Sequence, residues 1–124
     1  MEIRHKRHGR SISKNWGSVT EIINSKELSG RLLNLNENQS TSFHFHAEKF
    51  KTIYVLYGSL TIEIIDKENA DRLKYVIDSE ECFDVDPNIV HRLYPTEGSE
   101  GSVTAIEVST HHSDNDVYRV EIFN

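Results

Sequence analysis

The chain has 124 residues, a length that fits one domain with a hydrophobic core of its own. Its formal net charge of −6 at pH 7 argues against a nucleic-acid-binding domain. A single cysteine, Cys82, excludes an internal disulfide framework and a cysteine-rich zinc site. No apolar run approaches the roughly 20 residues that a membrane-spanning helix needs, so we expect no membrane partner.

Residues 1–13 carry a cluster of basic side chains with no apolar segment behind them. This pattern argues against a secretory signal and predicts a basic N-terminal arm or a first edge strand. The domain itself is expected to occupy residues 14–124. A lone cysteine and the lack of a signal fit a reducing compartment, so we expect a cytoplasmic protein.

Short apolar runs dominate the rest of the chain, and no stretch keeps a helical period. Leu60, Ile62 and Ile64 alternate with polar neighbours and would share one face of a strand. The predicted strands cover 19–23, 31–35, 41–46, 52–57, 60–65, 73–77, 82–85, 89–94, 103–109 and 117–123. About ten short strands separated by turn signals predict an all-β fold, an antiparallel sandwich or barrel.

Two histidines lie two residues apart in one of these strands. His44 and His46 therefore share a face, and Phe43 and Phe45 share the other. Imidazoles inside a barrel are costly unless a metal, a ligand or ordered water satisfies them. The alternative is a pair of hydrogen-bonded or exposed histidines. A third histidine, His91, follows a predicted turn, and the three together are candidate metal ligands.

The spacing of these residues resembles the two motifs of the cupin family. The first motif reads His-X-His, three or four residues, Glu, six residues, Gly, and it matches His44, His46 and Gly58. The second reads Gly, five residues, Pro-X-Gly-X-X-His, and its histidine falls on His91.

Two further segments resemble the small mannose-6-phosphate isomerase-like cupins. Residues 14–17 read Lys-Asn-Trp-Gly, where that subgroup has a Lys-Pro-Trp-Gly opening. The strand-like segment 106–110 resembles the C-terminal segment of the subgroup. Three charged residues continue this match: Asp116, Arg119 and Glu121. The resemblance therefore covers nearly all of the predicted domain.

This resemblance implies a cupin barrel, a double-stranded β-helix or jelly roll of about ten short antiparallel strands. It also implies a divalent metal ion (Zn, Fe, Ni, Mn or Cu) on His44, His46 and His91, a sugar or sugar phosphate as ligand, and a homodimer. The implied reaction is an aldose–ketose isomerisation. In that reaction the metal polarises a carbonyl, and a carboxylate or histidine moves a proton between adjacent carbons.

The chain departs from the motifs at four positions. The metal-binding glutamate of the first motif falls on Lys51, so an ammonium replaces a carboxylate. In the second motif Glu80, Asp86 and Asn88 stand in place of the first glycine, the proline and the second glycine. Asparagine tolerates a positive φ, so we expect Asn88 to keep the turn.

Three arrangements are open at the site. The metal is held by the three histidines alone, with Lys51 turned away or neutral. Alternatively, Glu48 supplies a carboxylate from a shifted loop. In the third arrangement there is no metal, and Lys51 itself binds an anionic or carbonyl ligand.

Three functions remain open as well. The first is an isomerase-like enzyme, with Lys51 and Glu48 as candidate catalytic residues. The second is a three-histidine iron dioxygenase that acts on a small thiol or diketone. The third is a non-catalytic cupin that binds a small carbohydrate or an anionic metabolite, with Lys51 in place of the metal-ligand glutamate.

Sequence position also predicts the environment of some neighbouring residues. Arg92 follows His91 and points to the opposite face of the strand, so we expect it to form an outer ion pair. The adjacent His111 and His112 are expected at the surface. Cys82 lies on a predicted strand and is expected to pack in the core.

Overall fold

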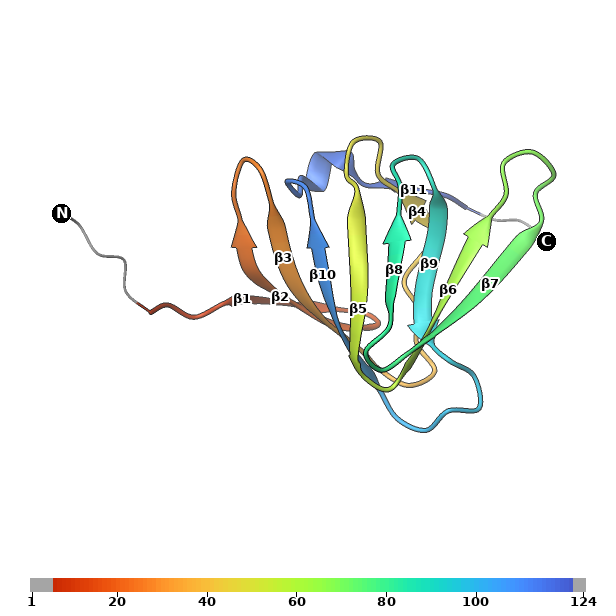
Figure 1. Cartoon of the computed structure of the whole chain (residues 1–124), viewed down its shortest axis with the longest axis horizontal. Coiled ribbons are helices and arrows are strands. Elements are labelled where there is room, and N and C mark those ends of the chain that lie inside the picture. Colours follow the sequence, from red (N-terminus) through yellow and green to blue (C-terminus); the bar gives the residue numbers. More distant parts are fainter. Residues whose placement is uncertain (1–5, 122–124) are drawn as a thin grey trace.

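The computed structural model describes residues 6–121, which form two antiparallel sheets (Figure 1). The first sheet contains β1 (Arg10–Lys14), β2 (Gly17–Asn24), β3 (Ser29–Leu35), β10 (Val103–Ser109), β5 (Lys51–Tyr57) and β8 (Cys82–Val85), in that order. The second contains β11 (Tyr118–Arg119), β4 (His44–Phe45), β9 (Val90–Pro95), β6 (Ser59–Ile65) and β7 (Arg72–Asp78), in that order. The predicted all-β jelly-roll architecture is confirmed.

Helix is confined, within the described residues, to a single 3₁₀ turn, η1 (Asp114–Asp116). No helix there is long and apolar enough to cross a membrane.

Most predicted strands match the observed ones, and the differences lie at the edges of the sheets. β1 is the edge strand of the six-stranded sheet and pairs with β2, with Ile12 opposite Val19. The strand predicted at 41–46 is reduced to β4, because the residues on either side of it leave the ladder. The strand predicted at 117–123 is reduced to β11 within the described residues, and its last two residues lie outside them.

The inward faces of the two sheets divide the barrel into an apolar end and a polar end. Along β10, Val103 and Ala105 face inward at one end, and Glu107 and Ser109 face inward at the other. β5 follows the same rule, since Val55 and Ile53 are followed toward its start by Lys51. The apolar core contains Val19, Leu33, Leu35, Ile53, Val55, Leu60, Ile62, Ile77, Val85, Leu93, Val103 and Ala105. The polar end of the barrel contains the candidate site.

Two turns that carry glycine in the cupin motifs are made here by other residues. Glu80 and Asn88 have φ angles of 73° and 70°, in the left-handed region. The Asn88 amide donates to the His46 carbonyl at 2.7 Å, so this turn holds the end of the histidine segment. The expectation that Asn88 keeps the turn is confirmed. Gly58 has φ 91°, and a Cβ there would lie 2.9 Å from the Ser102 carbonyl oxygen, which explains why glycine occupies this position.

The outer face of the five-stranded sheet carries an ion pair stacked on aromatic rings. Arg92 donates to the Glu63 carboxylate at 2.9 Å, and its guanidinium lies 4.7 Å from the ring centre of Phe43. The predicted outer ion pair of Arg92 is confirmed. Beside it, Phe45 stacks on Tyr118 with ring centres 5.0 Å apart.

The predicted burial of Cys82 is wrong, since its side chain is exposed. Cys82 lies opposite Tyr54 in the ladder between β8 and β5, whereas Phe83 lies opposite the buried Ile53. Strand alternation therefore places Phe83 inside and Cys82 outside.

Candidate functional site

Three histidines from two strands converge at the polar end of the barrel. His44 lies directly opposite His91 in the ladder between β4 and β9, and His46 follows two residues later on the same face. The ring centres are 4.5 Å apart for His44 and His91, 5.3 Å for His44 and His46, and 6.2 Å for His46 and His91. The alternation predicted from the sequence therefore brings all three imidazoles together.

The hydrogen bonds of the three rings fix which nitrogen carries the proton. Each Nδ1 contacts a backbone carbonyl oxygen, which can only accept, so each Nδ1 is the donor. The acceptors are the carbonyl oxygens of Ser42 for His44 (2.8 Å), Asp116 for His46 (2.9 Å) and Ile89 for His91 (2.8 Å). In the neutral rings each Nε2 therefore presents a lone pair. The Nε2 of His91 is buried without a hydrogen-bond partner among the described residues.

Burial keeps these imidazoles neutral. Burial, with a further contribution from the nearby Lys51 ammonium, lowers the pKa of His44 to about 4 and that of His46 to about 3. The same two causes, burial first, hold the pKa of His91 well below its usual value. At neutral pH the three rings are hydrogen-bond acceptors at Nε2 and carry no charge.

Lys51 enters the same space from β5. Its side chain is only 2% exposed and lines a cavity of about 140 Å³ together with His44 and His46. Among residues 6–121, no hydrogen bond or ion pair engages its ammonium group. Burial lowers its pKa to about 8, partly offset by the Glu107 carboxylate. At pH 7 the group is therefore still mostly a cation.

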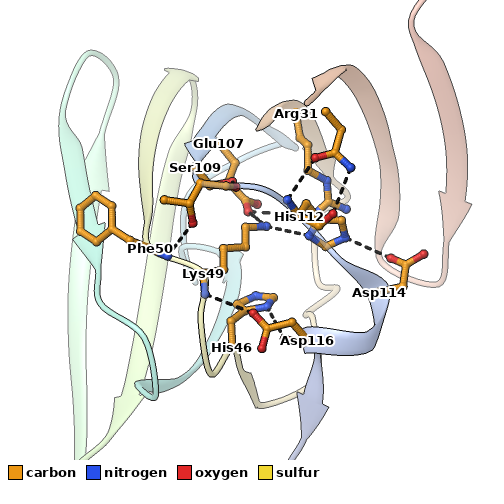
Figure 2. Close-up of polar contacts among 11 residues, drawn as sticks. Arg31, His46, Lys49, Phe50, Glu107, Ser109, His112, Asp114 and Asp116 are labelled. Atoms are coloured by element: carbon orange, nitrogen blue, oxygen red, sulfur yellow. Dashed lines mark hydrogen bonds and ion pairs between the residues drawn. The ribbon is translucent and has the colours of Figure 1, made fainter. Parts of the chain in front are cut away.

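A second buried lysine, Lys49, is engaged by two side chains (Figure 2). Its ammonium forms an ion pair with Glu107 and donates to the Nδ1 of His112 at 3.0 Å. The Nε2 of His112 then donates to the exposed Asp114 at 3.0 Å. These four side chains form a continuous polar array from solvent to the barrel interior.

Among the described residues, Glu107 is the one strand carboxylate that lines the cavity, and the exposed Asp114 lines it from η1. Burial alone would raise the pKa of Glu107, but Lys51, Lys49 and Arg31 together hold the pKa well below its usual range. Arg31 approaches the carboxylate at 3.9 Å. Three cations thus face a single buried carboxylate, and the histidines contribute no charge at neutral pH. The polar end of the barrel has an excess of positive charge.

Asp116 organises the loop between the histidines and the lysines (Figure 2). Its carboxylate accepts from the backbone amides of Ala47, Glu48 and Lys49 at 2.8 to 3.3 Å. Its carbonyl oxygen accepts from His46. With the loop fixed in this way, the side chain of Glu48 is exposed and is not part of the cavity lining. The structure therefore does not bring the candidate Glu48 to the site.

The three histidines match a metal site in the kind of donor but not in their arrangement. Neutral imidazoles whose Nδ1–H is held by a carbonyl are typical ligands of Zn²⁺ and similar ions. The distance between His46 and His91, however, exceeds the about 5 Å between ring centres that a shared tetrahedral ion would give. Lys51 also places an ammonium beside them. Among the described residues no three histidine, cysteine or acidic side chains are arranged to hold one ion.

Sequence reasoning missed two members of the polar array. His112 was expected at the surface, but it is partly buried and lines the cavity, because Lys49 and Asp114 hold its two ring nitrogens. Lys49 lies in a loop without periodicity, so nothing in the sequence marks it as buried. The burial of Glu107 could have been predicted, because it continues the alternation of apolar residues along β10.

Comparison with known proteins supports the fold. No protein-family profile matches the sequence, and no curated protein sequence matches it. The capsular polysaccharide assembling protein CapF from Staphylococcus aureus has a solved structure that superposes with a TM-score of 0.80 at 17% identity, over 92% of this chain. Oxalate decarboxylase from Bacillus subtilis superposes with a TM-score of 0.77 at 18% identity, over 90% of this chain.

This chain covers only 34% of the CapF chain and 30% of the oxalate decarboxylase chain, about a third of each. At these identities the likeness establishes the fold. The chain has the jelly-roll barrel fold of the cupins.

Proposed function

We propose that the chain binds a small hydroxylated carboxylic acid in the barrel cavity. The observation that carries the proposal is the Lys51 ammonium, which is buried beside the cavity and has no hydrogen-bond or ion-pair partner among residues 6–121. A buried charge is costly unless it is paired, so an anionic ligand would stabilise this group. Lys51 then takes the place of the metal-ligand glutamate of the cupin motif and binds the ligand directly.

The histidines define the second half of the ligand. A carboxylate alone would meet the Nε2 lone pairs of His44 and His46, which repel it. A hydroxyl group donates to such a nitrogen, so a hydroxy acid satisfies both halves of the cavity. The ligand class therefore combines one carboxylate for Lys51 with at least one hydroxyl for an imidazole.

The cavity volume limits the size of the ligand. About 140 Å³ corresponds to roughly five water molecules, which is room for an acid of about three or four carbon atoms. Cavities that enclose larger ligands start at roughly 300 Å³. A sugar phosphate would have to extend into the adjoining groove of about 400 Å³, which shares Lys14 and Arg31 with the cavity.

Calorimetry and thermal denaturation with D-glycerate test this proposal. Glycerol, which lacks the carboxylate, and propionate, which lacks the hydroxyl, are the matched controls. Glycerate at 100 times its Kd should raise the free energy of unfolding by about 2.7 kcal/mol. The effect should disappear in Lys51→Met and persist in Lys26→Met, a change at an exposed loop position. Equal responses to all three compounds, or binding that survives Lys51→Met, would refute the proposal.

A divalent metal on His44, His46 and His91 is the second candidate, and the three free Nε2 lone pairs favour it. Elemental analysis of protein purified without a histidine tag, followed by zinc titration, tests this candidate directly. Zinc binding in the wild type supports it. Zinc binding only in Lys51→Glu, which restores the carboxylate of the motif, supports the anion-binding pocket instead. Isomerisation and iron-dependent dioxygenation rest on sequence resemblance, and isomerase and oxygen-uptake assays would test them.

A further inference from the structure

Two buried lysines lie at the polar end of the barrel, and only one of them is engaged by other side chains. We propose that the other, Lys51, is a nucleophile that forms a covalent imine with small 2-oxo acids entering the cavity. The inference rests on the proposed function, because it uses the same cavity and the same attraction for a carboxylate.

The contrast between Lys49 and Lys51 carries the inference. Both side chains are 2% exposed. Lys49 is held by Glu107 on one side and His112 on the other, so two of its three N–H groups are already engaged. Lys51 lines the cavity, and among the described residues no hydrogen bond or ion pair occupies its nitrogen. Its nitrogen is therefore available to a ligand.

The surroundings of Lys51 increase the fraction of its neutral form. A lysine becomes an effective nucleophile when burial or a neighbouring cation reduces its affinity for the proton. Burial is the main cause that lowers the pKa of Lys51. Lys49 and Arg31 lower it further, whereas the Glu107 carboxylate, which is paired with Lys49, raises it. With a pKa of about 8, about a tenth of the Lys51 side chains carry a free amine at pH 7.

The covalent step balances without an external oxidant or reductant. The Lys51 amine adds to the carbonyl carbon, and a carbon–nitrogen bond forms as the carbonyl becomes a hydroxyl. Loss of that hydroxyl with the nitrogen-bound hydrogen releases one water molecule and leaves the imine. When protonated, the imine keeps the positive charge of the original ammonium, so Glu107 and the ligand carboxylate face the same charge as before.

The class of carbonyl compound follows from the same geometry. In a 2-oxo acid the carbonyl carbon is bonded directly to the carboxylate. A lysine that attracts the carboxylate therefore has the reactive carbon within reach. Arg31 lines the same cavity and offers a second cation for the carboxylate once Lys51 has reacted. A neutral aldehyde or ketone lacks this anchor and should react less.

Reductive trapping tests the inference on the full-length chain. Protein incubated with pyruvate and sodium cyanoborohydride should gain one 1-carboxyethyl group, the product of imine formation with loss of water and reduction, and peptide mapping should place it on Lys51. We expect at least tenfold more adduct on Lys51 than on the exposed Lys26 of the same molecules, which is the internal control. Acetone, which lacks the carboxylate, should give at least tenfold less. Lys51→Arg, which keeps the charge, should abolish the adduct.

The outcomes separate this inference from the proposed function. Adduct spread evenly over the exposed lysines, or adduct on Lys49 rather than Lys51, overturns the imine. Pyruvate binding is measured separately by calorimetry without reductant. If pyruvate binds in a Lys51-dependent way but leaves no adduct, the imine fails and anion binding stands. If neither binding nor adduct is seen with pyruvate, the imine fails. The proposed function is then decided by D-glycerate, because pyruvate lacks the hydroxyl group that the histidines require. Because mapping uses the wild type, a folding defect in Lys51→Arg does not affect the test.

Discussion

Replacing Lys51 with methionine should make the protein more stable at neutral pH, although it removes the group proposed to bind the ligand. The two side chains are similar in length, and methionine adapts easily to a buried position. The substitution therefore removes a buried charge without opening a large cavity. This outcome is opposite to that of most core substitutions, which destabilise.

The pKa of Lys51 gives the size of the effect. The pKa falls from 10.5 to about 8 on folding, and this net shift already includes the attraction to Glu107. At about 1.4 kcal/mol per pKa unit, the ammonium costs the folded state about 3 kcal/mol. We expect Lys51→Met to recover between about 1 and 3 kcal/mol, which corresponds to several degrees in Tm for a domain of this size.

The pH dependence distinguishes a charge effect from a packing effect. Below pH 8 the folded and unfolded chains both carry the proton on Lys51, and the cost is fully present. Between about 8 and 10.5 the folded chain loses that proton first, so the stability of the wild type rises toward that of the variant. By pH 10 the difference should be below about 1 kcal/mol.

Urea denaturation at about pH 7 and pH 10, in the absence of ligand, measures both quantities. Lys26→Met, at an exposed position, should change the free energy of unfolding by less than about 0.5 kcal/mol at either pH. The reasoning is refuted if Lys51→Met is less stable than the wild type at pH 7. It is also refuted if the difference is the same at both pH values.

Three further predictions concern the groups around Lys51. The free energy of unfolding should fall as the pH drops from about 6.5 toward 4, because the unfolded His44 and His46 take up protons that the folded ones, with pKa values of about 4 and 3, do not; a flat profile of Tm against pH contradicts this. Lys49→Met should cost about 3 kcal/mol in urea denaturation because it removes one partner of a buried ion pair, and the double variant with Glu107→Leu should recover at least half of that loss. Asp116→Ala should cost about 2 kcal/mol because three backbone amides lose their acceptor, whereas Asp116→Asn, whose amide oxygen still accepts, should cost less than half as much.

The alternation of side chains along each strand made several features of the site predictable from the sequence. Alternation put His44 and His46 on one face of their segment, and the structure has both imidazoles in the cavity that Lys51 also lines. The outward direction of Arg92 follows from the same rule. These predictions depend on the two-residue period of a strand and on nothing beyond the strand itself.

The residues that sequence reasoning missed depend on contacts between distant segments. Lys49 is buried only because Glu107 and His112, about sixty residues later in the chain, meet it inside the barrel. Neither pairing leaves a local signature, since strand order and register are set by the whole fold.

The charge imbalance at the polar end links stability to function. If the Lys51 ammonium served only the fold, substitution by an apolar side chain would improve the protein without loss, and the buried Glu107 would still have Lys49 and Arg31. Without a ligand, the buried ammonium costs the folded state about 3 kcal/mol. An anion bound to Lys51 would offset that cost. The anion would also interact strongly with an ammonium group that is largely shielded from water. The stability of the free protein and its affinity for the proposed ligand therefore depend on the same ammonium group.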